Sequence, residues 1–427
     1  MKTLKVGMLG CGNVGSQIAR LLVANKADLA SRAGAQLELV KVAVKDIKAK
    51  RDGIATPLLT DDPYSVVNDP EIDLIIEVIG GISPAKELIL AAFKNGKSVV
   101  TANKALLAKE GAALYQAAGE ANVDLYYEAA VAGAIPILRP LRESLVGDHV
   151  RRIMGIVNGT TNYILTKMDE SGTAFADALK QAQELGFAEA DPTADVEGID
   201  ASDKAAILAG LAFHSRVTDK DVYREGITKI TATDVKVAKA MDMVIKLLAI
   251  TELTASGEIS VRVHPALISR THPLASVRES FNAVFVEAQS AGQMMFYGKG
   301  AGGEPTASAV LGDLVAIARH KVLGGIGPKE SDYASLKIAP MGETKTRYLI
   351  RLNVADKPGV LESVAHVFAS HSVSIQTVRQ TGAGDKAELI IMTHTSTESA
   401  LSATVKELGK LPAVTDVASV LRVEGAI

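Results

Sequence analysis

A glycine-rich turn after a short apolar run constrains the fold of this chain more than any other sequence feature. The turn occupies residues 10–15 and reads GCGNVG, which matches the pattern GxGxxG. Lys5–Leu9 before it is typical of a buried strand, and Ser16–Ala24 after it is typical of a helix. In this strand–turn–helix context the pattern predicts a dinucleotide-binding fold.

Each glycine of the turn has a physical role in such a site. Gly10 allows the tight turn, Gly12 lets the backbone approach a pyrophosphate, and Gly15 lets helix and strand pack closely. The free N–H groups at the start of the helix then bind the phosphates, and Asn13 and Val14 of the turn are further candidate contacts. Glycine also occurs in tight turns for steric reasons alone, so the prediction depends on the surrounding strand and helix.

The following residues continue as an alternation of strands and helices. Such an alternation predicts a parallel, doubly wound sheet with right-handed crossovers. The strand ends line the cofactor crevice, which makes Gly80, Thr101 and Lys104 candidate contacts. The later predicted strands are Leu37–Val44, Asp73–Ile79, Ser98–Thr101 and Val123–Tyr127, with helices at Pro84–Asn95 and Ala105–Ala121.

The residues after the second strand bear on the choice between NAD and NADP. An acidic residue there binds ribose hydroxyls, whereas cations accommodate a 2′-phosphate. The segment contains the cations Lys45, Lys48, Lys50 and Arg51 and the acids Asp46 and Asp52. The cations favour NADP(H), with Lys45 and Arg51 as phosphate ligands, while Asp46 keeps NAD as an alternative. A solvated basic loop would show the same residues.

Length and composition limit the remaining choices. A chain of 427 residues is expected to form two or three domains. Its net charge of −3 gives no electrostatic case for nucleic acid or an anionic membrane, and no apolar run reaches the roughly 20 residues that span a bilayer. The single cysteine rules out an internal disulfide, and a strand pattern begins by Leu4, where a signal peptide would have to be. We therefore expect a cytoplasmic protein.

An acidic cluster that leads to Lys204 is the second informative feature. The sequence from Asp195 reads as a helix with a largely apolar second half, and Asp200 and Lys204 share one face of it. A surface ion pair is the plainer interpretation, because this spacing is common on exposed helices. The apolar surroundings favour a buried pair instead, and a buried lysine is suited to proton exchange with an alcohol or carbonyl oxygen. Carboxylates upstream would bind a substrate ammonium group.

Two further turns are candidate binding elements. Residues 155–163 form a strand–turn–helix junction whose helix N-terminus either holds a substrate carboxylate or is simply capped. Residues 298–306 form a glycine-rich junction before the predicted helix Thr306–His320, and the glycines imply close approach by the cofactor.

At these residues the chain resembles homoserine dehydrogenase, in the longer form that carries a C-terminal ACT domain. The resemblance implies a reversible, NAD(P)-dependent conversion of aspartate 4-semialdehyde to homoserine, on the route to threonine and methionine. That substrate has an ammonium group, a carboxylate and a reducible carbonyl. Carboxylates of the chain would bind the ammonium group, the amide-rich helix start would bind the carboxylate, and the lysines would act on the carbonyl. The resemblance rests on six stretches: GCGNVG, TANKALLA, YEAAVAGAIPI, GIVNGTTNYIL, EADPTADVEGIDASDKAAILA and KGAGGEPTASAV.

The resemblance also implies roles for individual residues. Lys204 resembles the proton donor to the aldehyde oxygen, and Lys104 a second lysine at the substrate and nicotinamide. The implied substrate-contacting acids are Glu189, Asp195 and Asp200, with Thr160 near the carboxylate.

Cofactor and cation contacts are implied as well. Gly302 resembles a nucleotide contact. Lys45 stands where arginine is expected in many members, which keeps the charge but loses bidentate phosphate geometry. A structural site for Na⁺, or another monovalent cation, would use one side chain and backbone carbonyls, and hard oxygen ligands suit such an ion. Its implied ligands are Glu128, Val131, Gly133 and Ile135.

The C-terminal part is expected to be a separate module. Glycines and prolines interrupt any periodicity between Lys321 and Lys345, and the six elements that follow have a βαββαβ order, which is a ferredoxin-like topology. The turn Asp356–Leu361 resembles the ligand loop of ACT domains. The resemblance implies threonine as a feedback inhibitor, and a dimerisation module without a ligand is the alternative. We expect deletion of this module to leave catalysis intact.

We thus expect an α/β protein in three parts, and the resemblance implies a homodimer or homotetramer. A Rossmann-type nucleotide-binding domain would comprise residues 1–130 and 303–325, and an α+β substrate-binding and dimerisation domain residues 131–302. A linker at 326–345 would lead to the ACT regulatory domain at 346–427.

Two other functions fit parts of the sequence. An amino-acid-sensing regulator with an inert nucleotide domain would not need Lys204 and its acids. Aspartate-semialdehyde dehydrogenase requires a thiolate nucleophile, but the only cysteine, Cys11, lies in the phosphate turn. The dehydrogenase of homoserine therefore explains most of the sequence.

Overall fold

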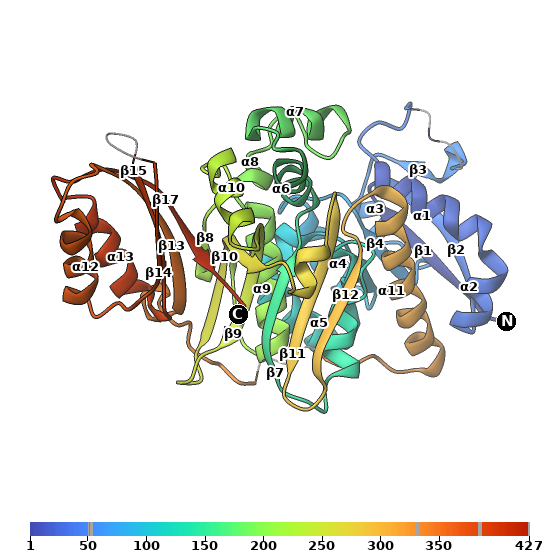
Figure 1. The fold of residues 1–427 in the computed structure, drawn as a ribbon. Coiled ribbons are helices and arrows are strands. Elements are labelled where there is room, and N and C mark those ends of the chain that lie inside the picture. The colour runs from blue at the N-terminus through green and yellow to red at the C-terminus, as the bar shows by residue number, and fades with distance from the viewer. Residues whose placement is uncertain (50, 52–53, 330–332, 383–386, 426–427) are drawn as a thin grey trace. The chain divides into compact units, whose positions relative to one another are not determined.

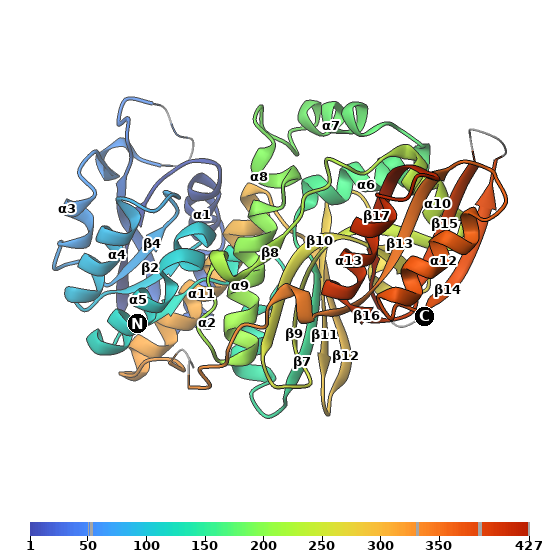
Figure 2. The same ribbon diagram turned by 90° about the vertical axis from the view of Figure 1, so that its left-hand side faces the viewer.

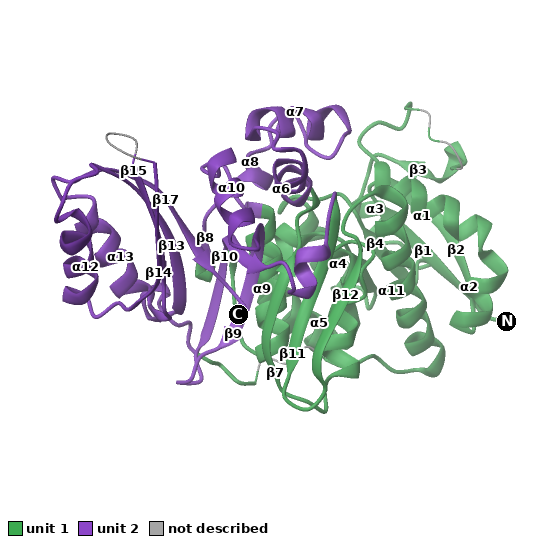
Figure 3. Ribbon diagram, viewed as in Figure 1, with its two compact units in different colours: residues 1–159, 200–222, 280–336 green, residues 160–199, 223–279, 337–427 purple. Residues whose placement is uncertain are grey.

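The computed structural model describes residues 1–49, 51, 54–329, 333–382 and 387–425, which form two compact units. The first unit contains residues 1–159, 200–222 and 280–336, and the second contains residues 160–199, 223–279 and 337–427 (Figure 3). The expected α/β class is confirmed. The segment 131–302, expected as a middle domain, is divided between the two units.

The N-terminal part of the first unit is a six-stranded parallel sheet in the order β3-β2-β1-β4-β5-β6 (Figure 1). This order is that of a doubly wound dinucleotide-binding fold, with its crevice at the carboxyl ends of the strands. The glycine turn follows β1 at that end. The strands are β1 (Thr3–Leu9), β2 (Gln36–Ala43), β3 (Leu59–Thr60), β4 (Leu74–Glu77), β5 (Ser98–Thr101) and β6 (Leu125–Tyr126).

Helices cover both faces of this sheet. Helix α11 comes from far along the chain and packs against α1 and α2, while α4 packs against α3 and α5. Apolar side chains of β1, α1 and α11 share one buried core, so residues 303–323 belong structurally with the nucleotide-binding sheet. The helices are α1 (Asn13–Ala24), α2 (Lys26–Ala33), α3 (Tyr64–Val67), α4 (Ala85–Lys94), α5 (Lys104–Ala121) and α11 (Gly303–Leu323).

The first unit also contains three antiparallel strands and most of a buried helix. The strands are β7 (Val150–Ile156), β11 (Phe281–Ala288) and β12 (Gly292–Lys299), with β11 in the middle. Helix α9 (Ile199–Phe213) is buried over almost its whole length, as the apolar sequence predicts.

The second unit contains a mixed sheet in the order β9-β10-β17-β13-β15-β14. Its last four strands, with α12 and α13 on one face, form the predicted ferredoxin-like ACT domain (Figure 2). Strand β17 pairs on its other side with β10, through Ala266 and Arg422, and Glu424 N–H donates to Leu267 O over 2.9 Å. Removing the ACT domain would expose the β10 edge. The expectation that its deletion leaves catalysis intact stays a prediction.

The elements of the second unit have the following bounds. The helices are α6 (Gly159–Ser171, whose first residue belongs to the first unit), α7 (Phe175–Glu184), α8 (Thr193–Val196), α10 (Ala232–Ala240), α12 (Val360–Ser370) and α13 (Glu398–Leu408). The strands are β8 (Tyr223–Arg224), β9 (Met243–Leu253), β10 (Ile259–Ser269), β13 (Lys345–Val354), β14 (Ile375–Thr381), β15 (Ala387–Thr393), β16 (Ser396–Thr397) and β17 (Val414–Val423). Among the described residues no helix is long and apolar enough to cross a membrane.

The acidic cluster departs from its prediction in one respect. The expected single helix from Asp195 is interrupted at Gly198, whose φ of +76° is left-handed and separates α8 from α9. Glycine adopts this conformation at low cost, so it lets the chain change direction between the two helices. Asp195 therefore lies on α8, whereas Asp200 and Lys204 lie on α9.

Candidate active site

Lys204 is a buried lysine held by two oxygen atoms. Its Nζ lies 2.7 Å from Asp200 Oδ2, one helical turn earlier on α9, and donates to the carbonyl oxygen of Val157 over 2.6 Å. Both Lys204 and Asp200 are 7% exposed. The predicted i,i+4 pair therefore forms, and burial excludes the interpretation as a plain surface pair.

Asp200 also binds a second lysine, Lys104. Its Oδ1 accepts a hydrogen bond from Lys104 Nζ, and its Oδ2 accepts from Asn158 Nδ2 at 2.9 Å. Burial alone would raise the pKa of Asp200, but the charges and hydrogen bonds of Lys204 and Lys104 hold that pKa well below its ordinary range. The two lysines thus favour the ionised form of Asp200, and this carboxylate ties both lysines to one point.

Lys104 is placed by the end of strand β5. Asn103 caps α5, because its side chain accepts from Leu106 N over 3.2 Å and donates to Gly81 O over 2.7 Å. Lys104 is the first residue of α5, and its side chain is 42% exposed. The three charged groups therefore lie at the carboxyl end of the parallel sheet, where a doubly wound fold binds its ligand.

Val157 and Asn158 are the contacts that the sequence did not single out. They lie between β7 and α6, inside the junction expected to offer a helix N-terminus to a carboxylate. The Val157 carbonyl and the Asn158 amide hold Lys204 and Asp200. The only sequence signal for this is their position at the end of a strand.

The predicted substrate contacts Thr160, Glu189 and Asp195 belong to the second unit. Thr160 is buried near the start of α6, and its hydroxyl donates to Phe187 O over 2.6 Å. This bond holds α6 to the segment that leads to Glu189, which is exposed. Asp195 is partly exposed on α8.

The glycine turn has the geometry that the sequence predicts. Gly10 has a φ of +95°, and a Cβ there would lie 2.7 Å from Val78 O. A Cβ on Gly15 would lie 2.6 Å from Gly10 O, so this glycine is needed for close packing of α1 on the turn. Gly12 has open space around it at the start of α1, next to Asn13 and Val14. Backbone N–H groups there are available to phosphates.

A second helix begins at the same place. Gly302 has a φ of +117° and precedes α11, and a Cβ on Gly303 would lie 2.5 Å from Asn13 Oδ1. The helix starts three residues before the predicted Thr306 and includes Pro305 in its first turn, where proline is tolerated. The N-termini of α1 and α11 therefore converge, which strengthens the site for an anionic group.

The remaining cofactor candidates differ in what they can contact. Gly80 has a φ of +79°, and the space where a Cβ would lie is open. Thr101 is fully buried, and its hydroxyl donates to Glu77 Oε2 over 2.5 Å, which leaves its backbone for any contact with a cofactor. Lys45 is exposed two residues after the end of β2, whereas Arg51 donates to Asp46 O and Ala49 O at 2.8 Å each. Lys50 and Asp52 lie outside the described residues.

The predicted cation loop is buried and built around Glu128. The Glu128 carboxylate accepts from the backbone N–H groups of Ile137, Leu138 and Arg139 at 2.6–2.8 Å. Ala132 and Gly133 both adopt left-handed conformations, with φ of +56° and +57°. The loop therefore offers backbone oxygens in a tight turn, while its one carboxylate already binds three donors. No cluster of three or more His, Cys, Asp or Glu ligands occurs among the described residues.

A dinucleotide-binding sheet whose strand ends carry a buried carboxylate paired with two lysines, one buried and one partly exposed, is typical of an NAD(P)-dependent oxidoreductase. Models of three protein families match the chain in the corresponding segments. They are the NAD-binding domain of homoserine dehydrogenase at residues 10–128, homoserine dehydrogenase at residues 136–315 and the ACT domain at residues 348–413.

Individual relatives match over the whole chain. The homoserine dehydrogenases of Mycobacterium tuberculosis and Corynebacterium glutamicum are each 54% identical to it, over 99% and 98% of this chain and 98% and 95% of theirs. A crystal structure of a homoserine dehydrogenase from Thiobacillus denitrificans is 40% identical, with a TM-score of 0.94 and 99% coverage of both chains. A hyperthermophilic archaeal homoserine dehydrogenase in complex with NADPH is 27% identical, with a TM-score of 0.65, and covers 77% of this chain and 100% of its own. The chain belongs to the homoserine dehydrogenase family.

Asp203, next to Lys204 in the sequence, makes stability depend on pH. Burial, followed by the charges of Asp200 and Asp219, raises the pKa of Asp203 to about 6. The unfolded chain releases this proton near pH 4, so between pH 4 and 6 the folded state holds more protons and the free energy of unfolding falls as pH rises. Asp203→Asn should remove this fall. The difference in free energy of unfolding between pH 4 and pH 7 should therefore be smaller in the variant by on the order of 2 kcal/mol. Denaturation midpoints at a series of pH values measure it.

The matched control is Asp61→Asn, at an exposed position in the same unit. It should leave the pH dependence unchanged. Parallel curves for Asp203→Asn and the unsubstituted enzyme would contradict the role of Asp203.

Proposed function

We propose that this enzyme interconverts L-aspartate 4-semialdehyde and L-homoserine with NADP(H), with Lys204 as its proton donor and acceptor. The buried contact between Lys204 and Asp200 supports this proposal more than any other observation. A surface pair would have no reason to be buried and tied to a backbone carbonyl. A regulatory protein with an inert nucleotide domain would have no need of a second lysine on the same carboxylate.

The nicotinamide, when bound, supplies the hydride to the carbonyl carbon or accepts it from the alcohol carbon. During reduction Lys204 gives its proton to the carbonyl oxygen, which becomes the hydroxyl of homoserine. In the reverse direction it takes that proton back. Asp200 orients the ammonium group of Lys204, and Lys104 adds positive charge where the alkoxide develops.

The substrate's other groups match the predicted contacts. Glu189 and Asp195 would bind the ammonium group, and Thr160 would lie near the carboxylate. Gly10, Gly12, Asn13, Val14 and Gly15 would hold the dinucleotide phosphates, with Gly80, Thr101 and Gly302 as further contacts. The open space in front of Gly12 and the converging helix N-termini support this part of the proposal.

We propose NADP as the preferred form, because Lys45 is exposed at the end of β2, where a 2′-phosphate is recognised. Arg51 would assist only after releasing Asp46 O and Ala49 O. A monovalent cation, Na⁺ in the first place, would use the backbone oxygens of Val131, Gly133 and Ile135. Glu128 would join them as the single charged ligand, and its bonds to three N–H groups suit an ion of low charge.

We propose threonine as the effector of the ACT domain, bound at the turn Asp356–Leu361. Gly359, with a φ of +87°, precedes α12 without a side-chain cap. The Val360 N–H donates to Lys357 O over 3.3 Å, and the other N–H groups of the first turn are the candidates to bind a carboxylate. We also propose a homodimer or homotetramer on the resemblance. The exposed side chains of Met295 and Tyr297 on strand β12 support an interface there.

Substitution of Lys204 tests the proposed chemistry. Lys204→Met keeps the side chain's length and removes the proton donor, so turnover should fall by about 10²–10⁴. Affinity for NADP⁺ should stay within about twofold, because the glycine turn is untouched. The control is Lys109→Met, at an exposed position of α5, which should keep full turnover. Steady-state oxidation of homoserine and nucleotide titration give both numbers. Full activity of Lys204→Met would remove this residue from the mechanism.

Substitution of Lys45 tests the preference for NADP. Lys45→Ala removes an exposed cation from the proposed 2′-phosphate site. It should raise the KM for NADP⁺ by about tenfold and leave the KM for NAD⁺ nearly unchanged. Lys48→Ala removes the same charge from the same loop and should have a smaller effect. Equal losses for the two nucleotides would show that Lys45 contributes only to the general field.

Substitution of Asp356 tests the effector site. Asp356 accepts a hydrogen bond from Gln380 at 3.0 Å, which holds the turn to β14. Asp356→Ala should weaken inhibition by threonine at least about tenfold while kcat stays unchanged, because the residue lies on the ACT domain. Glu362→Ala, an exposed change in the first turn of α12, is the control. Inhibition of both variants at the concentration that inhibits the unsubstituted enzyme would place threonine elsewhere.

A further inference from the structure

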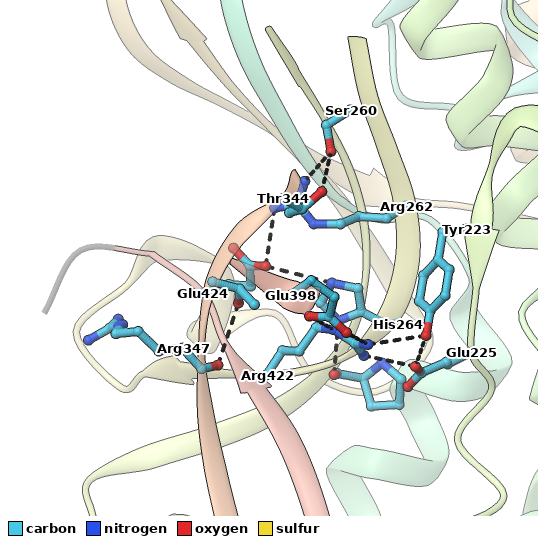
Figure 4. Close-up of polar contacts among 12 residues, drawn as sticks. Tyr223, Glu225, Ser260, Arg262, His264, Thr344, Arg347, Glu398, Arg422 and Glu424 are labelled. Atoms are coloured by element: carbon cyan, nitrogen blue, oxygen red, sulfur yellow. Dashed lines mark hydrogen bonds and ion pairs between the residues drawn. The ribbon is translucent and has the colours of Figure 1, made fainter. Parts of the chain in front are cut away.

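A polar cluster at the end of strand β17 connects the ACT domain to the strand β8 beside it. Arg422 on β17 is 7% exposed, and its Nη1 lies 2.9 Å from Glu225 Oε1 (Figure 4). Its Nη2 donates to the Tyr223 hydroxyl over 3.1 Å. On the other side, its Nε and Nη2 bind both oxygens of Glu398, the first residue of α13. One guanidinium thus joins two carboxylates from separate segments.

Aromatic rings hold the same guanidinium in place. The ring centroids of Tyr223 and Tyr348 lie 5.2 and 5.7 Å from its central carbon, and the Tyr348 hydroxyl donates to Glu398 Oε1 over 2.6 Å. Burial acts to lower the pKa of Arg422, but Glu398 and Glu225 raise it above its ordinary value. Partial burial acts to raise the pKa of Glu225, but the charge of Arg422 outweighs it, and the pKa of Glu225 lies below its ordinary value. Both groups are therefore charged across the physiological range.

The segment after Glu225 is fastened to helix α8. Glu225 N–H donates to Val263 O of β10 over 2.8 Å, and Ile227 N–H donates to Val196 O over 2.8 Å. A Cβ on Gly226 would lie 2.3 Å from that same Val196 oxygen, so the two segments lie in direct contact. Thr228 Oγ1 also donates to Glu197 Oε1 over 3.1 Å. Helix α8 has only one turn of its own, so these bonds set where it lies.

The charged residues of the cluster are not the ones that best stabilise a fold. Buried ion pairs repay their desolvation cost poorly, and apolar residues of similar shape often stabilise a protein as well or better. A guanidinium, by contrast, fixes direction, because its donors form a rigid fork that binds two carboxylates at set angles. The contacts lead from Arg422 through Glu225 to α8, which carries Asp195.

We propose that Arg422 is a positioning residue for the substrate site: it holds Glu225, and through residues 225–228 it holds α8 and the Asp195 carboxylate in the place that binds the substrate ammonium group. This inference rests on the proposed function, in which Asp195 contacts the substrate. It assigns the ACT domain a part in substrate binding that does not depend on any effector.

A double-mutant cycle in the full-length enzyme tests this inference. Arg422→Lys keeps the charge and loses the fork, and Glu225→Gln keeps the shape of a partly exposed side chain and loses its charge. Each should raise the KM for homoserine by about tenfold, while kcat and the KM for NADP⁺ stay within about twofold. The double variant should be no worse than the more affected single variant, because both remove one interaction. Tyr223→Phe, which deletes only a hydroxyl, should give a smaller rise in the same KM.

The matched control is Arg351→Lys. Arg351 is 5% exposed on β13 of the same domain, and its ion pairs are with Asp234 at 3.0 Å and Glu388 at 2.6 Å, neither of which belongs to residues 223–228. A role in stability alone would make both arginine variants lower the melting temperature with no change in KM, and that outcome would overturn the proposal. If Arg422→Lys does not fold, Glu225→Gln and Tyr223→Phe decide the question in the same way.

Asp195→Asn separates this inference from the proposed function. A raised KM in Asp195→Asn, with unchanged KM in the cluster variants, would refute the positioning role and leave the substrate assignment intact. Raised KM in the cluster variants alone would refute Asp195 as the substrate ligand, and with it the route from Arg422 through α8 to that carboxylate.

Discussion

The structure of the proposed catalytic centre depends on one buried carboxylate that binds two lysines. Asp200 could not be buried as an anion without cations beside it, and Lys204 could not be buried as a cation without Asp200. The Val157 carbonyl and the Asn158 amide complete the hydrogen bonds that burial requires. The result is a pair of ammonium groups held at fixed positions at the carboxyl end of the parallel sheet, in the fold region where a dinucleotide binds.

The nucleotide-binding elements follow from backbone sterics more than from side-chain chemistry. Gly10 and Gly15 leave no room for a Cβ, and Gly12 leaves open space in front of α1. The start of α11 is pressed against Asn13 in the same way at Gly303. Close backbone approach at these points brings two helix N-termini together, and that convergence provides the partial positive charge that a pyrophosphate needs.

Sequence patterns predicted the fold well wherever periodicity and glycine chemistry act locally. The parallel sheet, the ACT topology and the buried Asp200–Lys204 pair were all expected. Local patterns could not show that Gly198 divides the acidic segment into α8 and α9, because a glycine inside a helical pattern has several outcomes. They also could not show that Asn158 binds Asp200, or that Arg422 reaches Glu225, since both contacts join segments far apart in the chain. The roles of Glu189, Asp195, Thr160 and the cation loop stay predictions from the resemblance.

We propose that Lys204 exchanges a proton with the reacting oxygen while Asp200 holds it in place. A crystal structure of the enzyme with NADP⁺ and homoserine measures this directly. We expect the homoserine hydroxyl within roughly 2.6–3.2 Å of Lys204 Nζ, with Asp200 still bound to that lysine. A hydroxyl bound by another residue, with Lys204 more than one water molecule away, would show that Lys204 is not the proton donor.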